Sequence, residues 1–171
     1  MRLAPVPMFF FPDHQAVVRF SGESSKTTHG ATECIDACRL FGSMLLKALR
    51  GQSKEEILFE DPFPWWSEPP LSDRIQAIAD GDYRRTPERD IRGSGYVVES
   101  LEAALWCFYH TLSFQDAVLR AVNLGDDADT TGAVCGQIAG AFYGKSQIPE
   151  RWVQQLANRD LIEGLAVGLY E

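Results

Sequence analysis

The sequence predicts an all-α fold, organised as a single domain over residues 1–171. Apolar residues recur every three or four positions through most of the chain, which is typical of helices that bury one face. Capping and stop residues flank these segments. Residues 6–11 and 16–20 are candidates for extended structure, but no alternating hairpin pair follows them. We therefore expect a helix bundle rather than a sheet.

Length and composition exclude several classes of function. A chain of 171 residues can form one domain with a sizeable core, and 45% hydrophobic with 23% charged residues is ordinary for a globular protein. The formal net charge of −8 disfavours a nucleic-acid-binding surface. No apolar run is long enough to span a bilayer or to serve as a signal-peptide core. We expect neither a nucleic-acid nor a membrane partner.

The four cysteines are predicted to be reduced. Each occupies an apolar position of a helical pattern, and no two form a C-x-x-C pair. Cys34 and Cys38 are one helical turn apart, where helix geometry disfavours a disulfide, and the spacings do not suit zinc. Reduced cysteines favour a cytoplasmic location.

No helix is predicted within the first thirty residues. Prolines at positions 5 and 7 favour extended backbone over residues 3–7, and residues 21–30 have the composition of a polar loop. The chain opens abruptly on an apolar stretch, which leads us to expect that it has been cut from something longer.

Helices are predicted from Ala31 onwards. The first is expected to end before Gly51, and Ser53 with Glu56 forms a capping box for a short second helix. Residues 61–70, which include the pair Trp65-Trp66, have four prolines and are predicted to form an irregular loop.

A short helix through residues 71–78 is expected to end near Gly81. The charged segment 82–93 that follows, with four arginines, is predicted to be a solvated loop.

The second half of the chain alternates helices with short loops. The loop Gly93-Ser94-Gly95-Tyr96 leads into a helix, and Ser113 caps the next one. Residues 133–144 form a helix with unusually small side chains, which we expect to be central because other helices can approach it closely. Pro149 is predicted at the first position of a further helix with Trp152 and Leu156 inward, before a last helix over residues 161–169.

An acidic run, residues 125–132, lies between two of these helices. Asp126, Asp127 and Asp129 are more carboxylates than a helix cap needs, and crowded oxygen ligands usually hold a cation. An EF-hand beginning at Asp127 is excluded because its twelfth position is Ile138. A haloacid-dehalogenase-type phosphatase motif would have to end a buried strand, whereas the preceding segment has helical spacing. A magnesium or manganese site of Asp127, Asp129 and Thr130 is the favoured interpretation over capping alone.

Residues 123–130 resemble a motif of the ADP-ribosylglycohydrolases, the family of the dinitrogenase-reductase-activating and ADP-ribose-arginine hydrolases. The run Asn-Leu-Gly-Asp-Asp-Ala-Asp-Thr is similar to the family's N-L-G-G-D-T-D-T, which precedes a small-residue helix ending in Tyr-Gly. Asp126 departs from the pattern, because the family usually has glycine there. The resemblance implies that Asp127, Asp129 and Thr130 bind a binuclear Mg²⁺ or Mn²⁺ centre, and that the fold is the family's orthogonal helix bundle.

Further matches imply residues that contact ADP-ribose. The loop Gly93, Ser94, Gly95 and Tyr96, followed by Glu-Ser, resembles the loop that lines the ligand, and Thr28-His29 resembles a T-H motif in which the histidine, here His29, contacts it. Met1-Arg2 resembles the tail of a phosphate-binding segment, which implies a weaker role for Arg2 near the diphosphate.

The family has an N-terminal half that supplies further metal ligands and an acidic residue implicated in catalysis, and its motifs are absent from this sequence. The catalytic residue is therefore unknown. The resemblance implies a hydrolase that removes ADP-ribose from a modified side chain or a small ADP-riboside, with a partner chain or an oligomer supplying the other half. The alternative is a catalytically incomplete remnant that binds ADP-ribose or acts as a structural partner.

Overall fold

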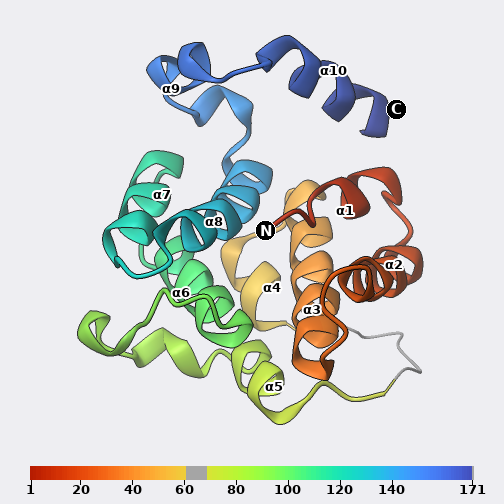
Figure 1. The fold of residues 1–171 in the computed structure, drawn as a ribbon, viewed down its shortest axis with the longest axis vertical. Helices are drawn as coiled ribbons and strands as arrows, with labels where there is room; N and C mark the ends of the chain where they lie inside the picture. The colour runs from red at the N-terminus through yellow and green to blue at the C-terminus, as the bar shows by residue number, and fades with distance from the viewer. Residues whose placement is uncertain (61–68, 171) are drawn as a thin grey trace.

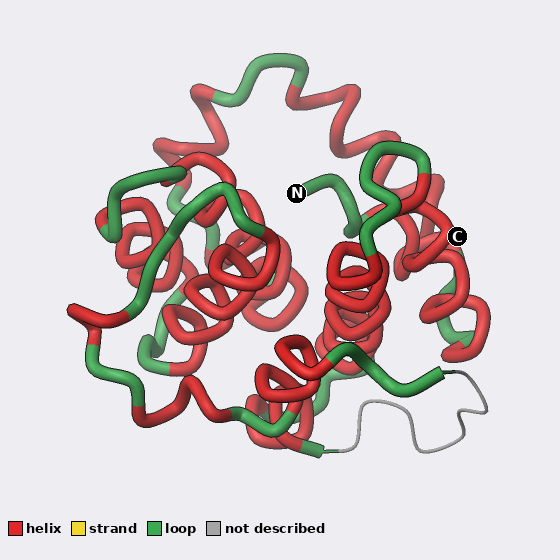
Figure 2. The backbone as a smooth tube through the Cα atoms, turned by 60° about the horizontal axis from the view of Figure 1, so that its bottom comes forward, coloured by secondary structure: helices red, strands yellow, loops and turns green. Residues whose placement is uncertain are grey.

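The computed structural model describes residues 1–60 and 69–170, and these residues form helices, 3₁₀ turns and loops with no strand (Figures 1 and 2). The all-α prediction is confirmed. The elements are α1 (Pro5–Phe9), α2 (His14–Lys26), α3 (Thr32–Leu49), α4 (Lys54–Phe59), α5 (Asp73–Ala79), η1 (Asp82–Arg85), η2 (Glu88–Asp90), α6 (Val97–Tyr109), α7 (Phe114–Asn123), α8 (Ala128–Tyr143), η3 (Lys145–Gln147), α9 (Glu150–Gln155) and α10 (Arg159–Tyr170).

Helices α3, α6 and α8 form the centre of the molecule. Each of the three packs against the other two, and α7 packs against both α8 and α6. Gly132, Gly136 and Gly140 lie on the side of α8 that faces α7, where a methyl group at Gly132 would stand 2.7 Å from a side-chain carbon of Val122. The small residues therefore let the two helices approach closely, and the predicted central position of this helix is confirmed.

The expectations of extended backbone over residues 3–7 and of a loop that begins at residue 21 are wrong, whereas residues 27–30 lie outside any helix, between α2 and α3. Pro5 stands in the first turn of α1, where the missing amide hydrogen is not needed, so it begins a helix rather than preventing one. The side chain of Asp13 caps α2 by accepting a hydrogen bond of 3.0 Å from the amide of Ala16. The candidate strands 6–11 and 16–20 therefore fall largely in helices.

Helix α2 also includes most of the predicted polar loop. Its buried residues follow helical spacing, and small ones such as Ser21 and Gly22 let it pack closely against α3. Ser21 lies directly against Gly42 of α3, which leaves no room for a side chain there. Packing against α3, rather than the polar composition of residues 21–26, therefore makes this segment helical.

Most of the predicted helix ends are confirmed. The Ser53–Glu56 capping box is present, Ser113 caps α7, and α8 is followed by Gly144. Gly51 and Gly81 follow α3 and α5 with positive φ angles of 74° and 77°, which glycine adopts without strain.

Two smaller expectations change. Pro149 is the N-cap of α9 rather than its first residue. Trp152 packs against the core as expected, but the side chain of Leu156 is 49% exposed rather than inward.

The charged segment 82–93 forms two 3₁₀ turns. Its four arginines are exposed, as predicted for a solvated segment, while Tyr83 and Ile91 are buried. Trp65 and Trp66, and most of the loop predicted around them, lie outside the described residues.

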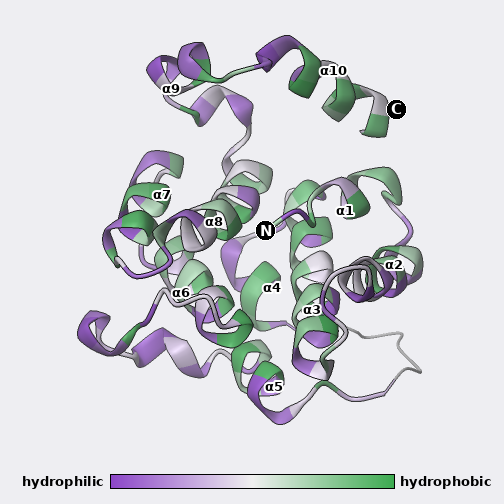
Figure 3. Ribbon diagram, in the orientation of Figure 1, coloured by the Kyte–Doolittle hydropathy of each residue, from purple (hydrophilic) through white to green (hydrophobic). Residues whose placement is uncertain are grey.

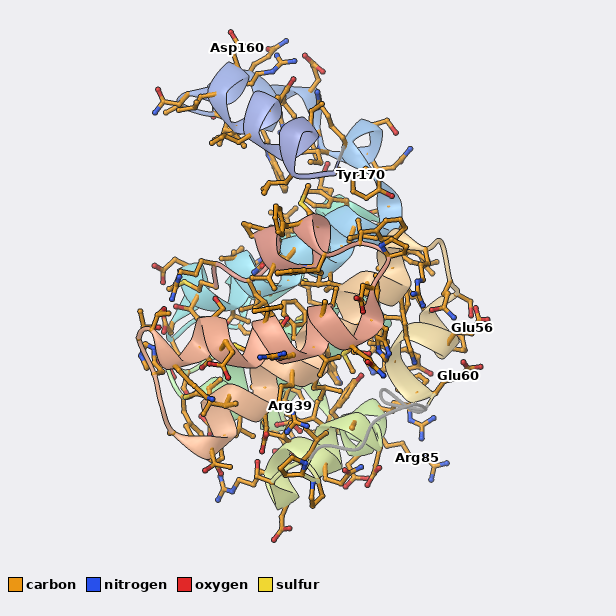
Figure 4. The ribbon with its side chains drawn as sticks, turned by 90° about the vertical axis from the view of Figure 1, so that its right-hand side faces the viewer. Arg39, Glu56, Glu60, Arg85, Asp160 and Tyr170 are labelled. Atoms are coloured by element: carbon orange, nitrogen blue, oxygen red, sulfur yellow. The ribbon has the colours of Figure 1, made fainter. Side chains whose placement is uncertain are left out.

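Helix α10 lies on the outside of the molecule and reaches back towards α1 (Figure 4). The rings of Tyr170 and Phe11 are 5.1 Å apart between centroids. Leu161, Ile162 and Leu165 of this helix are exposed, and Figure 3 shows hydrophobic residues along it. No helix among residues 1–60 and 69–170 is long and apolar enough to cross a membrane.

Candidate functional site

The acidic run forms the turn between α7 and α8. Gly125 and Asp126 both have positive φ angles, 80° and 54°, and Asp127 is the N-cap residue of α8. Asp126 thus adopts the left-handed conformation that favours glycine but that aspartate tolerates better than most residues. The turn is retained with aspartate at the position where the resemblance leads us to expect glycine.

The glycine loop before α6 packs against this acidic turn. The amide of Asp127 donates a hydrogen bond of 2.8 Å to the carbonyl oxygen of Gly93. A methyl group at Gly95 would stand 3.0 Å from a carboxylate oxygen of Asp127, and one at Gly93 would stand 2.9 Å from the hydroxyl oxygen of Thr131. Both positions therefore leave little or no room for a side chain.

The carboxylates of Asp127 and Asp129 lie together at the start of α8. The Asp127 carboxyl group in its protonated form can donate a hydrogen bond to the Asp129 carboxylate, and this bond, with further ones from the backbone amides of Thr130 and Asp129, lowers the pKa of Asp129. Two carboxylates this close repel each other unless a proton or a cation lies between them. Within the described residues, no group of three histidine, cysteine, aspartate or glutamate side chains converges as a metal site would require.

A cavity of about 670 Å³ opens beside this turn. It lies between the start of the chain, the end of α2, the first half of α3 and the starts of α6 and α8. Apolar side chains of Leu3, Phe41, Leu101 and Val134 form part of its lining. Its volume is in the range of small-molecule and cofactor sites.

The cavity brings together five of the nine residues predicted for the site. Its lining includes Arg2, His29, Gly95, Tyr96 and Thr130, from four separate parts of the chain.

The other four predicted residues lie outside the lining. The Asp127 side chain lies against Gly95, and Gly93 is buried against Thr131. Asp129 is exposed on the first turn of α8, and the hydroxyl of Ser94 donates a hydrogen bond to the carboxylate of Glu99.

Arg2 is held at the cavity by the end of α2. Its guanidinium donates hydrogen bonds of 2.5 Å to the hydroxyl of Thr27 and 3.2 Å to the carbonyl of Ser24. Gln137 of α8 fixes the same segment, because its amide group donates to the carbonyl of Met1 at 2.5 Å and accepts from the amide of Ala4 at 2.7 Å. A cationic side chain is thereby fixed beside the cavity.

His29 lies just beyond α2, where Ser25 fixes its backbone. The amide of His29 donates to the Ser25 carbonyl at 2.7 Å, and the Ser25 hydroxyl donates to the His29 carbonyl at 2.9 Å. These bonds leave the exposed His29 side chain at the cavity with its backbone fixed.

Among the lining residues that were not predicted for the site from the sequence, Glu33, Cys34 and Cys38 have ionisable side chains. Glu33, in the first turn of α3, accepts a hydrogen bond from the hydroxyl of Tyr96. Cys34 and Cys38 follow it along the same helix. Glu33 alone gives no distinctive signal, because an acid in the first turn of a helix is common, but its position four and five residues after His29 and Thr28 places it beside that motif.

Comparison with known proteins explains this arrangement. The sequence profile of the ADP-ribosylglycohydrolase family matches residues 1–171. The chain belongs to the ADP-ribosylglycohydrolase family.

Two curated relatives are named ADP-ribosylarginine hydrolase Tri1. The protein of Serratia proteamaculans (strain 568) is 38% identical over 170 residues, which is 99% of this chain and 45% of that protein. The protein of Pseudomonas putida (strain GB-1) is 40% identical over 171 residues, 100% of this chain and 44% of that one. This member of the ADP-ribosylglycohydrolase family therefore spans less than half the length of these two relatives.

A solved structure described as an ADP-ribosylglycohydrolase-related protein complex matches the fold. It has a TM-score of 0.83 and 38% sequence identity, and the match covers 98% of this chain and 56% of that one. The helix arrangement predicted for an ADP-ribosylglycohydrolase is confirmed.

Proposed function

We propose that this chain forms part of an ADP-ribosylglycohydrolase-type hydrolase, which removes ADP-ribose from a modified side chain or a small ADP-riboside with the help of a divalent metal centre. The observation that carries the proposal is the packing of the Gly93–Gly95 loop against Asp127 beside a cavity lined by Arg2 and His29. Family membership and the two relatives named as ADP-ribosylarginine hydrolases support it.

Side chains around the cavity have the chemistry that an ADP-ribose ligand needs. The guanidinium of Arg2 carries the positive charge that suits a diphosphate. His29 and the hydroxyl-bearing Tyr96 supply polar groups at the same cavity, above an apolar lining. We assign these three residues to binding, together with Gly93, Ser94 and Gly95 as the loop that holds Tyr96.

The acidic turn suits one side of a magnesium or manganese site. Asp127, Asp129 and the Thr130 hydroxyl are hard oxygen donors, and the two carboxylates already lie together. A divalent cation bound there would orient the ribose and polarise a water molecule. The described residues offer only this partial donor set, so we propose that a second chain completes a two-metal centre and supplies the catalytic acid.

A binding module without catalysis is the second candidate. It is favoured by the observation that no three metal-binding side chains converge within the described residues. Such a chain would still bind ADP-ribose in the cavity, with weak affinity for metal. The four cysteines, all free thiols, support a cytoplasmic location for either version.

An assay of ADP-ribose release from an ADP-ribosylated arginine substrate, with Mg²⁺ or Mn²⁺, separates the two candidates. Turnover by this chain together with the second chain, lost in Asp127→Ala and Asp129→Ala, would support the hydrolase. Binding of ADP-ribose without turnover when the second chain is also present would support the binding module. If ADP-ribose does not bind even with metal present, the ligand assignment is wrong.

A further inference from the structure

Three elements converge on the ring of Tyr96 at the mouth of the cavity. Tyr96 is the N-cap residue of α6, Glu33 lies in the first turn of α3, and Arg74 lies in the first turn of α5. The hydroxyl of Tyr96 donates a hydrogen bond to the carboxylate of Glu33. The guanidinium carbon of Arg74 stands 5.7 Å from the centroid of the ring. Glu33 and Tyr96 line the cavity, whereas Arg74 does not.

The scaffold behind this cluster is rigid. Asp36 of α3 is buried, and its carboxylate accepts hydrogen bonds of 2.9 Å from Arg39 and from the amide of Ser72, the N-cap residue of α5. The hydrogen bond from the Ser72 amide joins the start of α5 to α3, and so links the helices that carry Arg74 and Glu33. A buried carboxylate with two donors holds a defined geometry.

The backbone of Tyr96 is fixed as well. Its amide donates a hydrogen bond of 3.2 Å to the hydroxyl of Ser94, which in turn donates to the carboxylate of Glu99. The ring is 37% exposed, so packing alone does not immobilise it. The hydrogen bond at its hydroxyl and the cation beside its ring are therefore the contacts that determine where it lies.

A fixed aromatic ring at the mouth of a cavity provides a surface on which a flat heteroaromatic group stacks. The proposed ligand, ADP-ribose, has such a group in its base. The rest of the ligand, the diphosphate and the sugars, does not need an aromatic surface. The ring of Tyr96 should therefore strengthen the binding of ligands that carry a base and leave the binding of ligands without a base unchanged.

We propose that Glu33 and Arg74 are positioning residues that fix Tyr96 as the wall on which the base stacks, and that they thereby set the preference for a ligand that carries a base. This inference rests on the proposed function of the cavity. Glu33 acts through the hydroxyl of Tyr96, and Arg74 acts through its ring. Neither residue is required to touch the ligand.

Titration of the intact chain with ADP-ribose and with ribose 5-phosphate, followed by NMR chemical shifts, tests the inference. Glu33→Ala and Tyr96→Phe are each expected to weaken ADP-ribose binding roughly tenfold, because a hydrogen bond to a charged group is lost. The double variant Glu33→Ala with Tyr96→Phe should bind ADP-ribose no more weakly than either single variant. Glu33→Gln should bind ADP-ribose more tightly than Glu33→Ala, and Arg74→Ala should lose less affinity than Glu33→Ala. The affinity for ribose 5-phosphate should be the same in all of these variants as in the unaltered chain. Glu55→Ala, the loss of an exposed carboxylate on α4, is the matched control.

Equal weakening of both ligands in Glu33→Ala would overturn the inference, because Glu33 would then act on the fold as a whole. Unchanged ADP-ribose binding in that variant would overturn it too, while leaving the proposed function intact. If the unaltered chain binds no ADP-ribose, the proposed function and the role in base stacking both fail.

The hydrogen bond between Tyr96 and Glu33 can be tested without ligand, by following the phenol titration of ¹³C-labelled Tyr96 by NMR. The hydrogen bond to Glu33 raises the pKa of Tyr96, so Glu33→Ala should lower that pKa towards its ordinary value near 10. No change in the titration would show that the hydrogen bond is absent in solution.

Discussion

The amide of Asp127 donates a 2.8 Å hydrogen bond to the carbonyl oxygen of Gly93, and this bond joins the loop before α6 to the acidic turn before α8. The Asp127 side chain also lies against Gly95, the residue of the glycine loop that lines the cavity together with Tyr96. Two motifs that are far apart in the sequence therefore belong to one site.

Gly95→Ala is expected to weaken ADP-ribose binding with little effect on stability. The new methyl group would stand 3.0 Å from the Asp127 carboxylate, and the flexible end of that side chain would have to move. Because the position is exposed, we expect the free energy of unfolding to change by less than about 0.5 kcal/mol. Calorimetric titration and urea unfolding measure the two effects.

Gly164→Ala is the matched control for this substitution. Gly164 lies in α10 with no atom within 4 Å of the added methyl group, so ligand binding should not change. Equal ADP-ribose binding by Gly95→Ala and the unaltered chain would show that the position of the Asp127 carboxylate is unimportant.

Gln137→Ala is expected to release the start of the chain from α8. The substitution removes one hydrogen bond to Met1 and one from Ala4, and should lower the free energy of unfolding by about 1 kcal/mol. The amide of Ala4 should then exchange its hydrogen faster, and ADP-ribose binding should weaken because Arg2 is less well placed.

Gln137→Glu provides a finer comparison, because its carboxylate can accept from the Ala4 amide but cannot donate to the Met1 carbonyl. Gln154→Ala, which removes a hydrogen bond within α9, is the control. Unaltered exchange at Ala4 in Gln137→Ala would contradict the proposed attachment.

The four thiols are expected to react in order of their access to the cavity. Burial raises the pKa of Cys34 and Cys38, and raises that of Cys107 to about 12, so little thiolate is present at neutral pH. Iodoacetamide should label Cys34 first and Cys38 more slowly, with faster labelling as the pH rises, and ADP-ribose should protect both. Cys107 and Cys135 are buried and should react only after unfolding.

Mass spectrometry of peptides from a labelling time course follows each cysteine separately. Labelling of Cys135 at the rate of Cys34 in the folded protein would contradict the packing of α8. Labelling of Cys34 that is indifferent to ADP-ribose would contradict the position of the ligand.

Ser53→Ala is expected to lower the free energy of unfolding by about 1 kcal/mol near neutral pH, because it removes the N-cap of α4. Hydrogen bonds from the Ser53 side chain and backbone lower the pKa of Glu56. A lowered pKa in the folded state stabilises the protein above the ordinary glutamate pKa of 4.5, and this contribution is lost as the pH falls through the folded value. The stability difference between the two proteins should therefore shrink as the pH falls below about 4.5. Urea unfolding at several pH values measures it, and a difference that grows in acid would contradict the capping box.

The sequence predicts the fold best where helix ends are determined locally. Ser53, Ser113 and Gly81 act through their own neighbours, and these boundaries are confirmed. Helix α2 was not predicted because it depends on packing. Small residues such as Ser21 favour a loop by composition, yet they allow α2 to approach Gly42 of α3.

In the candidate site, too, features determined within one segment are predictable from the sequence, and features that depend on packing are not. Asp127 and the glycine loop carry recognisable motifs, and the structure brings them together as a motif-based interpretation requires. The contacts of Tyr96 with Glu33 and Arg74 depend on how three helices pack, and no spacing within one segment predicts them. The assignment of Asp127, Asp129 and Thr130 as metal ligands stays a prediction.

Calorimetric titration of this chain with ADP-ribose, in Mg²⁺ and then in EDTA, tests the central claim most directly. We expect tighter binding in Mg²⁺ than in EDTA, and we expect Asp127→Asn to remove that difference while it keeps the fold, since the side chains are nearly the same size. Equal affinity in Mg²⁺ and in EDTA, or a cation effect that persists in Asp127→Asn, would contradict the assignment of the acidic turn to a divalent cation.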